Sequence, residues 1–257
     1  MLDYYRIIIY LYSMNKLDNS KRTQIISLLV EGNSLRATSR ITGCSINTVT
    51  KLLVDVGRAC EKFHEETVRN VKASKIQADE TWSFVYSKKK NTPEAKQSEA
   101  GDVWTWVGMD AESKLVLSWF VGDRSADSAF LLMQDIASRL ASRVQLTTDA
   151  HNAYLTAVDD VFGYGIDYAQ LIKVYGKDYE GEKRYSPAEC LGTKTRVITG
   201  NPEKEHISTS YIERQNLTMR MHMRRFTRLT NAFSKKLENH CLAIALHFCV
   251  LQFCEGT

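Results

Sequence analysis

The stretch IQADETWSFV, residues 76–85, decides the fold of this chain. β-branched and aromatic side chains are frequent in it, which is typical of a β-strand, and it carries a carboxylate at Asp79. The residues before it, 20–57, show helical spacing with capping and turn residues. The change of period at Ile76 therefore separates a helical module from a module that begins with a strand.

Downstream of this strand, β-rich runs alternate with helical runs. In chain order the predicted elements are strands at 76–85, 103–110 and 115–121, a helix from Ala126 to about Leu140, a strand at 144–148, a helix at 152–161 and a strand at 170–175. The order β-β-β-α-β-α-β is that of a ribonuclease-H-like fold, an α/β layer architecture. This topology, rather than any periodicity, places the first strand beside the fourth and so brings Asp79 near Asp149. We predict that residues 176–205 form a long connecting loop.

In residues 20–57 we predict three short helices, with Ser20, Ser34 and Ser45 as their N-caps. Gly43 suits the left-handed turn between the second and the third helix. This is a helix-turn-helix pattern, whose final helix, ending near Val56, would lie in the major groove of DNA. Its solvent side carries four candidate DNA contacts, Asn47, Thr48, Thr50 and Lys51. A generic three-helix packing module is the alternative. Residues 58–75 predict a helical linker.

A third acid, Glu213, lies on a predicted helix capped by Ser208 or Thr209, and the sequence becomes basic directly after it. Candidate phosphate contacts there are Arg214, Arg220, Arg224 and Arg225. Carboxylates from two strands and a helix can converge on a pair of divalent ions, as in phosphoryl-transfer enzymes. Mg²⁺ suits such a site because it takes hard oxygen ligands. The alternative is that Asp79, Asp149 and Glu213 are three ordinary members of a set of 30 acids.

Composition agrees with a DNA-binding protein. The net charge is only +4, but both ends of the chain are basic around a slightly acidic centre, which favours an anionic polymer as partner. The six cysteines include no C-x-x-C pair, which argues against a zinc ribbon and for reduced thiols. The apolar run near the N-terminus is shorter than the roughly 20 residues that a bilayer requires. We interpret residues 1–13 as a non-native extension before Met14, with a short strand or interface segment as the alternative.

Three motifs resemble the insertion-sequence-one type of bacterial DDE transposase. They are ADETWSFV at 78–85, TTDA at 147–150, and TSYIERQN at 209–216 followed by RRFTRLTN at 224–231. The resemblance covers roughly Met14 to His247 and implies a catalytic triad of Asp79, Asp149 and Glu213. It also implies a helix-turn-helix that binds terminal inverted repeats. The chemistry would be Mg²⁺-dependent cleavage and transfer of double-stranded DNA, with Mn²⁺ as a substitute, by a homodimer or larger assembly at the bacterial nucleoid in the cytoplasm.

The domain map that follows is an α/β protein with an all-α domain in front. It consists of an extension at 1–13, a helix-turn-helix domain at 14–57, a helical linker at 58–75, a ribonuclease-H-like DDE catalytic domain at 76–247 and an atypical, truncated C-terminus at 248–257. Two other functions stay open. One is an impaired, truncated copy that only binds inverted repeats, and the other is a structure-selective nuclease of the same fold.

Several further residues carry weaker predictions. His151 follows Asp149 by two positions and is either a substrate contact or a loop residue without a chemical role. Glu80 is a further candidate for assisting the metal, but in a regular strand it should face away from Asp79 because side chains alternate. The four tryptophans are expected in the core of the sheet rather than stacked on bases: Trp82, Trp104, Trp106 and Trp119.

Overall fold

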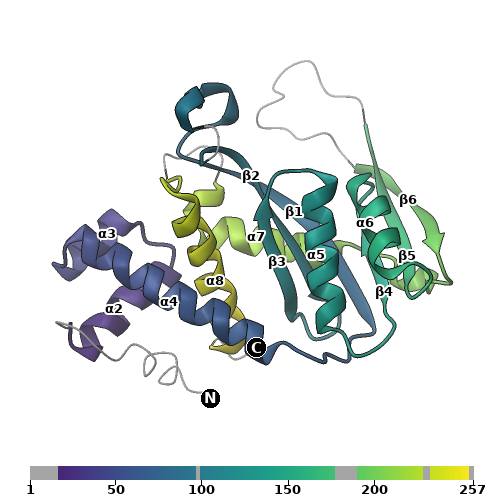
Figure 1. Cartoon of the computed structure of the whole chain (residues 1–257), viewed down its shortest axis with the longest axis horizontal. Coiled ribbons are helices and arrows are strands. Elements are labelled where there is room, and N and C mark those ends of the chain that lie inside the picture. The colour runs from purple at the N-terminus through teal and green to yellow at the C-terminus, as the bar shows by residue number, and fades with distance from the viewer. Residues whose placement is uncertain (1–16, 97–98, 177–189, 228–231, 255–257) are drawn as a thin grey trace.

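The chain folds around a six-stranded mixed sheet with helices on both faces (Figure 1). The computed structural model describes residues 17–96, 99–176, 190–227 and 232–254. The extension expected at 1–13 lies outside these residues. Within them, no helix has the length and apolar character that crossing a bilayer requires.

The sheet runs in the order β3-β2-β1-β4-β5-β6. Its strands are β1 (Lys75–Val85), β2 (Gly101–Asp110), β3 (Val116–Gly122), β4 (Gln145–Thr148), β5 (Asp167–Tyr175) and β6 (Cys190–Thr199). β1 pairs antiparallel with β2 and parallel with β4, and β4 pairs parallel with β5. The predicted adjacency of the first and fourth strands is therefore confirmed.

β6 corrects one prediction, because it lies inside the stretch 176–205 that was expected to be a loop. It pairs antiparallel with β5 at the edge of the sheet, and most of its side chains are exposed. An edge strand with both faces in solvent lacks the apolar alternation that marks strands in sequence. Residues 177–189 of the same stretch lie outside the described part of the chain.

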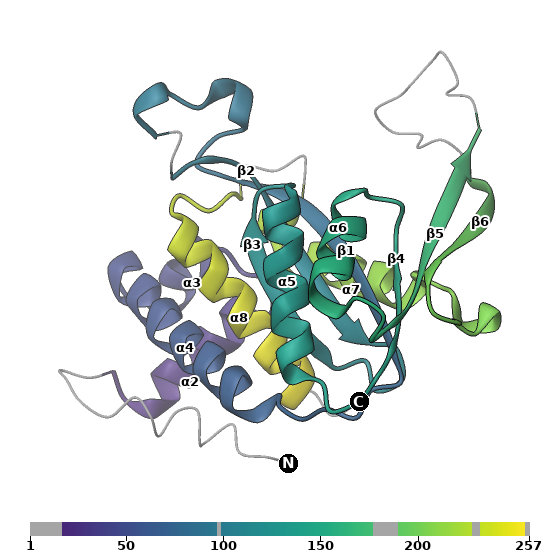
Figure 2. The same ribbon diagram turned by 45° about the vertical axis from the view of Figure 1, so that its right-hand side comes forward.

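Two helices, α5 (Ala126–Arg139) and α6 (Ala153–Phe162), cover one face of the sheet (Figure 2). The predicted apolar face of α5 is confirmed, since Ala129, Leu132, Met133 and Ile136 are all buried. α5 packs closely on β2 at Gly108, where an added Cβ would lie 2.4 Å from Cδ1 of Ile136. The side chains of β1 that face these helices are the even-numbered ones, such as Ile76 and Ala78.

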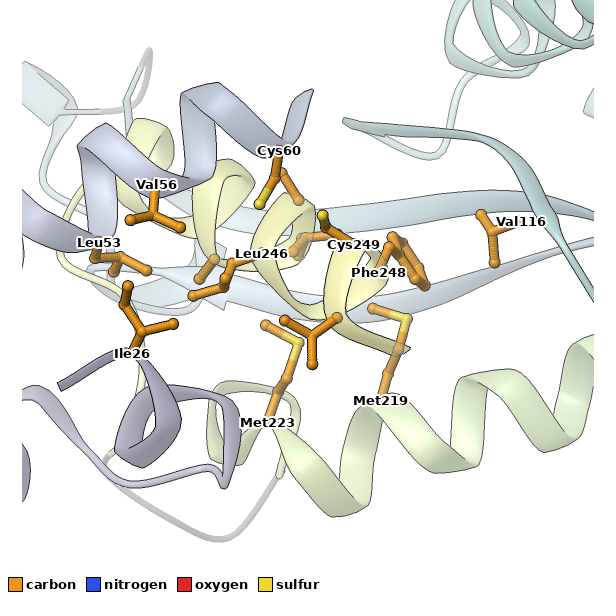
Figure 3. Close-up of a cluster of buried hydrophobic side chains, with 14 of the residues drawn as sticks. Ile26, Leu53, Val56, Cys60, Val116, Met219, Met223, Leu246, Phe248 and Cys249 are labelled. Carbon is orange, nitrogen blue, oxygen red and sulfur yellow. The ribbon is translucent and has the colours of Figure 1, made fainter. Parts of the chain in front are cut away.

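The opposite face carries α7 (Ser210–His222) and α8 (Leu237–Phe253). Phe248 of α8 and Met219 of α7 meet Val116 of β3 in one buried cluster (Figure 3). Residues 248–253, the described part of the predicted atypical C-terminus apart from Cys254, form the end of α8. Residues 255–257 lie outside the described part of the chain.

The amino-terminal helices are α2 (Asn19–Val30), α3 (Leu35–Thr42) and α4 (Ile46–Thr67). The caps predicted at Ser34 and Ser45 are confirmed, and Gly43 has the left-handed φ of 69° that its turn requires. Asp18 rather than Ser20 caps α2, accepting a hydrogen bond from the backbone N–H of Lys21 at 2.8 Å.

α4 is one continuous helix, where the sequence had suggested a helix ending near Val56 and a separate linker helix. No breaker lies at the expected boundary, and Gly57 has a packing role there instead. An added Cβ at Gly57 would lie 2.6 Å from Cβ of Leu242, so the glycine lets α4 and α8 cross closely. The resulting core joins Ile26 of α2 and Leu53 of α4 to buried side chains of α8 such as Leu246.

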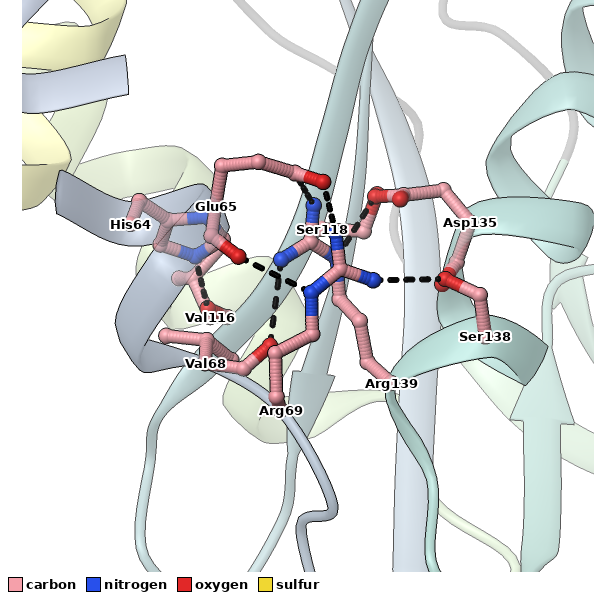
Figure 4. A network of polar contacts seen from close by, with 9 residues as sticks. All are labelled: His64, Glu65, Val68, Arg69, Val116, Ser118, Asp135, Ser138 and Arg139. Atoms are coloured by element: carbon pink, nitrogen blue, oxygen red, sulfur yellow. Dashed lines mark hydrogen bonds and ion pairs between the residues drawn. The ribbon is translucent and has the colours of Figure 1, made fainter. Parts of the chain in front are cut away.

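A buried arginine fastens the end of α4 to α5 (Figure 4). The guanidinium of Arg139 is 4% exposed and donates hydrogen bonds to Asp135 at 2.8 Å, Glu65 at 2.5 Å and the Val68 carbonyl at 3.1 Å. Asp135 also accepts a hydrogen bond from Ser118 of β3. The buried guanidinium of Arg139 therefore has hydrogen-bond acceptors and carboxylate charges around it, as a buried charge requires.

Candidate active site

Two of the predicted acids meet where β4 ends beside β1. The parallel register pairs Ala78 with Thr148, so Asp79 and Asp149 are the next residue along each strand. One carboxylate oxygen from each, together with one from Glu80, lie within 4.8 Å of one another. The structure therefore brings Asp79 and Asp149 together, as the topology predicted.

Glu80 joins this cluster from the other side of the sheet. Its carboxylate accepts two hydrogen bonds from Arg124, at 2.9 and 2.6 Å, and one from the hydroxyl of Tyr154 on α6, at 3.1 Å. Asp79 instead has its partner on α7, as the alternation of the strand predicted. The carboxylates of Asp79 and Glu80 can still approach each other, because β4 ends at Thr148 and the part of β1 beyond Ala78 has no strand beside it on the β4 side.

The clustered charge has an electrostatic consequence. Burial, together with the negative charges of Glu80 and Asp149, raises the pKa of Asp79 to about 7. Burial and the same group of carboxylates also raise the pKa of Tyr154, which keeps its hydroxyl neutral as a donor. A divalent cation would relieve this repulsion, and three carboxylates are the hard oxygen donors that Mg²⁺ and Mn²⁺ prefer. This donor set fits a divalent cation, with Glu80 in the place where the sequence predicted Glu213.

Gln77 and Asn216 position α7 over this cluster. The side-chain oxygen of Gln77 accepts hydrogen bonds from the first turn of α7, from the N–H groups of Tyr211 at 2.9 Å and Ile212 at 3.0 Å. These N–H groups belong to the set that a helix start leaves without partners in the helix. One turn on, Nδ2 of Asn216 donates to Oδ2 of Asp79 at 2.8 Å.

Asn216 is 2% exposed, and its Oδ1 has no hydrogen-bond partner among the described residues. The amide orientation follows from chemistry, because a carboxylate can accept only from the NH₂ group. Sequence reasoning missed both Gln77 and Asn216. The signal available for Asn216 was its position three residues after Glu213, on the same face of the helix.

Glu213 lies on the same helix but is not one of the three clustered carboxylates. Its Oε2 is 2.5 Å from Nζ of Lys173 on β5, and its Oε1 accepts a hydrogen bond from Thr209 at 2.5 Å. Burial lowers the pKa of Lys173, but the hydrogen bond and charge of Glu213, with smaller effects of Tyr175 and Asp79, outweigh it, so the pKa is raised. Lys173, like Gln77 and Asn216, is a site residue that the sequence did not indicate.

His151 remains without an assigned chemical role. Its backbone N–H donates to Oδ1 of Asp149 at 2.9 Å, which fixes the loop after β4. Its ring lies 5.9 Å from that of Trp106, which is fully buried as expected. Trp104 is partly exposed, with the guanidinium of Arg124 4.5 Å from its ring centroid.

The four candidate DNA contacts in the helical module occupy the first turns of α4. Asn47 and Lys51 are exposed, and Lys51 forms an ion pair with Asp55 at 2.5 Å. The hydroxyl of Thr48 lies 2.9 Å from that of the capping Ser45. Thr50 donates its hydroxyl to the backbone within the helix.

The four candidate arginines fall into two groups. Arg214, Arg220 and Arg224 are exposed along α7 and the short 3₁₀ turn after it. Arg225 instead donates to Oγ of Ser234 at 2.8 Å and to a backbone carbonyl of α8 at 3.2 Å. Burial lowers its pKa to about 10. These contacts give Arg225 a structural role that the basic run in the sequence did not indicate.

No protein-family model and no curated protein matches this sequence. Among solved structures, it is similar to the piggyBac transposase synaptic complex with hairpin DNA (8% identity, TM-score 0.44, covering 96% of this chain and 68% of that one). It is also similar to a simian T-cell lymphotropic virus intasome in complex with PP2A regulatory subunit B56 gamma (13%, TM-score 0.31, 86% and 64%). A third similarity is to a pre-cleavage Mos1 transpososome (10%, TM-score 0.24, 96% and 83%). At these identities and scores, the similarities carry no information about individual site residues.

Proposed function

We propose that this chain is a DDE transposase that cleaves and transfers DNA strands at the terminal inverted repeats of an insertion sequence. The observation that carries the proposal is the meeting of Asp79 and Asp149 at the end of the parallel β1–β4 pair. The helix that bears Glu213 is tied to the same spot by the hydrogen bond from Asn216 to Asp79. Two strands and one helix thus supply the acids, in a ribonuclease-H-like arrangement.

In this proposal Asp79, Asp149 and Glu213 hold Mg²⁺, or Mn²⁺ in its place. The bound ions supply activation of the attacking oxygen and stabilisation of the leaving oxygen at the scissile phosphate. The chain's own residues orient this set. Asn216 fixes one oxygen of Asp79, and Thr209 fixes one oxygen of Glu213.

The remaining parts of the proposal concern DNA. Exposed arginines at 214, 220 and 224 extend from the acid cluster and suit contacts with phosphates. The helices within 14–57 would read the inverted repeats through the exposed start of α4 as a helix-turn-helix. The enzyme would work as a homodimer or larger assembly in the bacterial cytoplasm, because two element ends must be joined.

The decisive experiment is cleavage of labelled duplex DNA that carries the element's own ends, in Mg²⁺ or in EDTA. Asp79→Asn and Glu213→Gln should abolish metal-dependent nicking at the repeat boundary. Asp159→Asn, the same change at an exposed position of α6, should leave it intact. Specific binding without nicking by the unaltered protein would contradict the proposal and identify a DNA-binding protein instead. Metal-dependent nicking by the full chain that is equally fast on duplexes without the repeat sequence would point to a structure-selective nuclease.

A further inference from the structure

Lys173 forms an ion pair with Glu213, the carboxylate that the proposed function assigns to a metal ion. Nζ of Lys173 is 2.5 Å from Oε2 of Glu213, and the two side chains are 32% and 38% exposed. The ammonium also interacts with the charge of Asp79. A positive charge is therefore paired with one of the three acids and lies within electrostatic range of a second.

The pair differs from an ordinary surface ion pair in how its partners are held. Glu213 belongs to α7, whose first turn is fixed by Gln77 and whose next turn is fixed to Asp79 through Asn216. Lys173 belongs to β5, two strands away from β1. The sheet and the helix thus bring the two charges together from separate elements, and Thr209 holds the other oxygen of Glu213.

We propose that Lys173 is a positioning residue that changes its ion-pair partner. Its ammonium pairs with Glu213 before divalent cations bind, and it pairs with a DNA phosphate afterwards. This inference rests on the proposed function. A pair of divalent ions among Asp79, Asp149 and Glu213 would outweigh the three carboxylate charges and would compete for the oxygen of Glu213 that Lys173 contacts, so the ammonium would need another anionic partner. The long, flexible stem of lysine allows this change of partner, and the phosphate of bound DNA supplies the charge.

A metal titration without DNA tests the first half of the inference. Lys173→Met removes the competing cation and keeps the length of the side chain. Calorimetric titration of the full chain with Mg²⁺ should give a dissociation constant about threefold to tenfold lower than that of the unaltered protein, because a partly screened charge has been removed. Lys194→Met is the matched control, since Lys194 is exposed on β6 opposite Ile172 and its change should leave the constant unaltered. Equal or weaker Mg²⁺ binding by Lys173→Met overturns the inference.

The salt dependence of DNA binding tests the second half. In Ca²⁺, the slope of log affinity against log salt for a short duplex should exceed the slope in EDTA by about one released counterion. This increment should vanish in Lys173→Met and return in Lys173→Arg. An increment that persists in Lys173→Met overturns the transfer to phosphate. Lys173→Gln repeats both measurements if the methionine variant proves unstable.

Failure of this inference can be distinguished from failure of the proposed function. If the Asp149→Asn variant binds Mg²⁺ as well as the unaltered protein does, or if neither binds it, the metal site is absent. Both the proposed function and the inference on Lys173 are then wrong. If that binding is present but Lys173→Met matches the unaltered protein, only the role of Lys173 falls.

Discussion

Asn216→Ala should weaken metal binding in a way that depends on pH. The side chain donates to Asp79 at 2.8 Å, and this bond lowers the pKa of a carboxyl that burial and the neighbouring acids raise to about 7. Loss of the donor disfavours the ionised form, so the pKa of Asp79 rises further. Metal ligands must be deprotonated, and the variant therefore competes less well for Mg²⁺ near neutral pH.

The size of the effect follows from the bond that is lost. A hydrogen bond to a charged group contributes about 1.5 to 3 kcal/mol, which corresponds to roughly tenfold to a hundredfold in an equilibrium constant. We expect the Mg²⁺ affinity of Asn216→Ala to fall by about tenfold at pH 6.5. At pH 8.5 the deficit should be smaller, because a larger share of Asp79 is then ionised in both proteins.

The assay is calorimetric Mg²⁺ titration at pH 6.5, 7.5 and 8.5, with cleavage rates measured in parallel. Thr218→Ala is the control, because Thr218 lies on the same helix and its hydroxyl bonds only to the carbonyl of Arg214 in the described structure. A deficit of equal size at all three pH values would refute the reasoning, since it would mean that Asn216 acts through packing and not through the charge of Asp79.

Three further predictions concern stability and DNA binding. Arg139→Met should lower the free energy of unfolding by about 1 to 3 kcal/mol, measured by urea denaturation, because it removes the hydrogen bonds to Asp135, Glu65 and the Val68 carbonyl while the two carboxylates keep contact with solvent. Arg225→Met should lower the unfolding midpoint yet keep the salt slope of DNA binding, whereas Arg214→Met should reduce that slope by about one and leave the midpoint unchanged. Stability should also fall between pH 6.5 and pH 5, because burial lowers the pKa of His64 to about 4 and the unfolded chain takes up a proton that the folded chain does not. That proton is worth about 2 kcal/mol at pH 5, and His64→Gln should make the decline shallower by about this amount in a pH series of urea unfolding; His240 and His247, whose pKa values burial lowers to about 3 and about 4, retain their own contributions.

The order of elements could be predicted from the sequence because each buried element carries its own signal. The apolar face of α5 and the serine caps of α3 and α4 are local features, and local features are readable without tertiary structure. The meeting of Asp79 and Asp149 was also predictable, but only from the topology that the element order implies. β6 could not be found, since both of its faces lie in solvent.

The residues that complete the site could not be predicted in the same way. Lys173 is one of many lysines, and its role depends on Glu213, which is forty residues further along the chain. Gln77 precedes the motif acid by two positions, yet its function is to receive the first turn of a helix more than 130 residues away. The inward contacts of Arg225 could not be predicted either, because a basic run does not reveal which of its members turns inward.

The placement of α7 links the acid cluster to the amino-terminal helices. The C-terminal end of α7 meets the turn after α2, where an added Cβ at Gly32 would lie 2.4 Å from the carbonyl oxygen of His222. Its middle packs through Met219 into the same core as Ile26 and Leu53. The third acid is therefore carried by a helix whose two ends are fixed by different parts of the chain, β1 at its start and α2 at its end. Any displacement of the amino-terminal helices on binding DNA would act on α7, and thereby on the distance between Glu213 and the pair of aspartates.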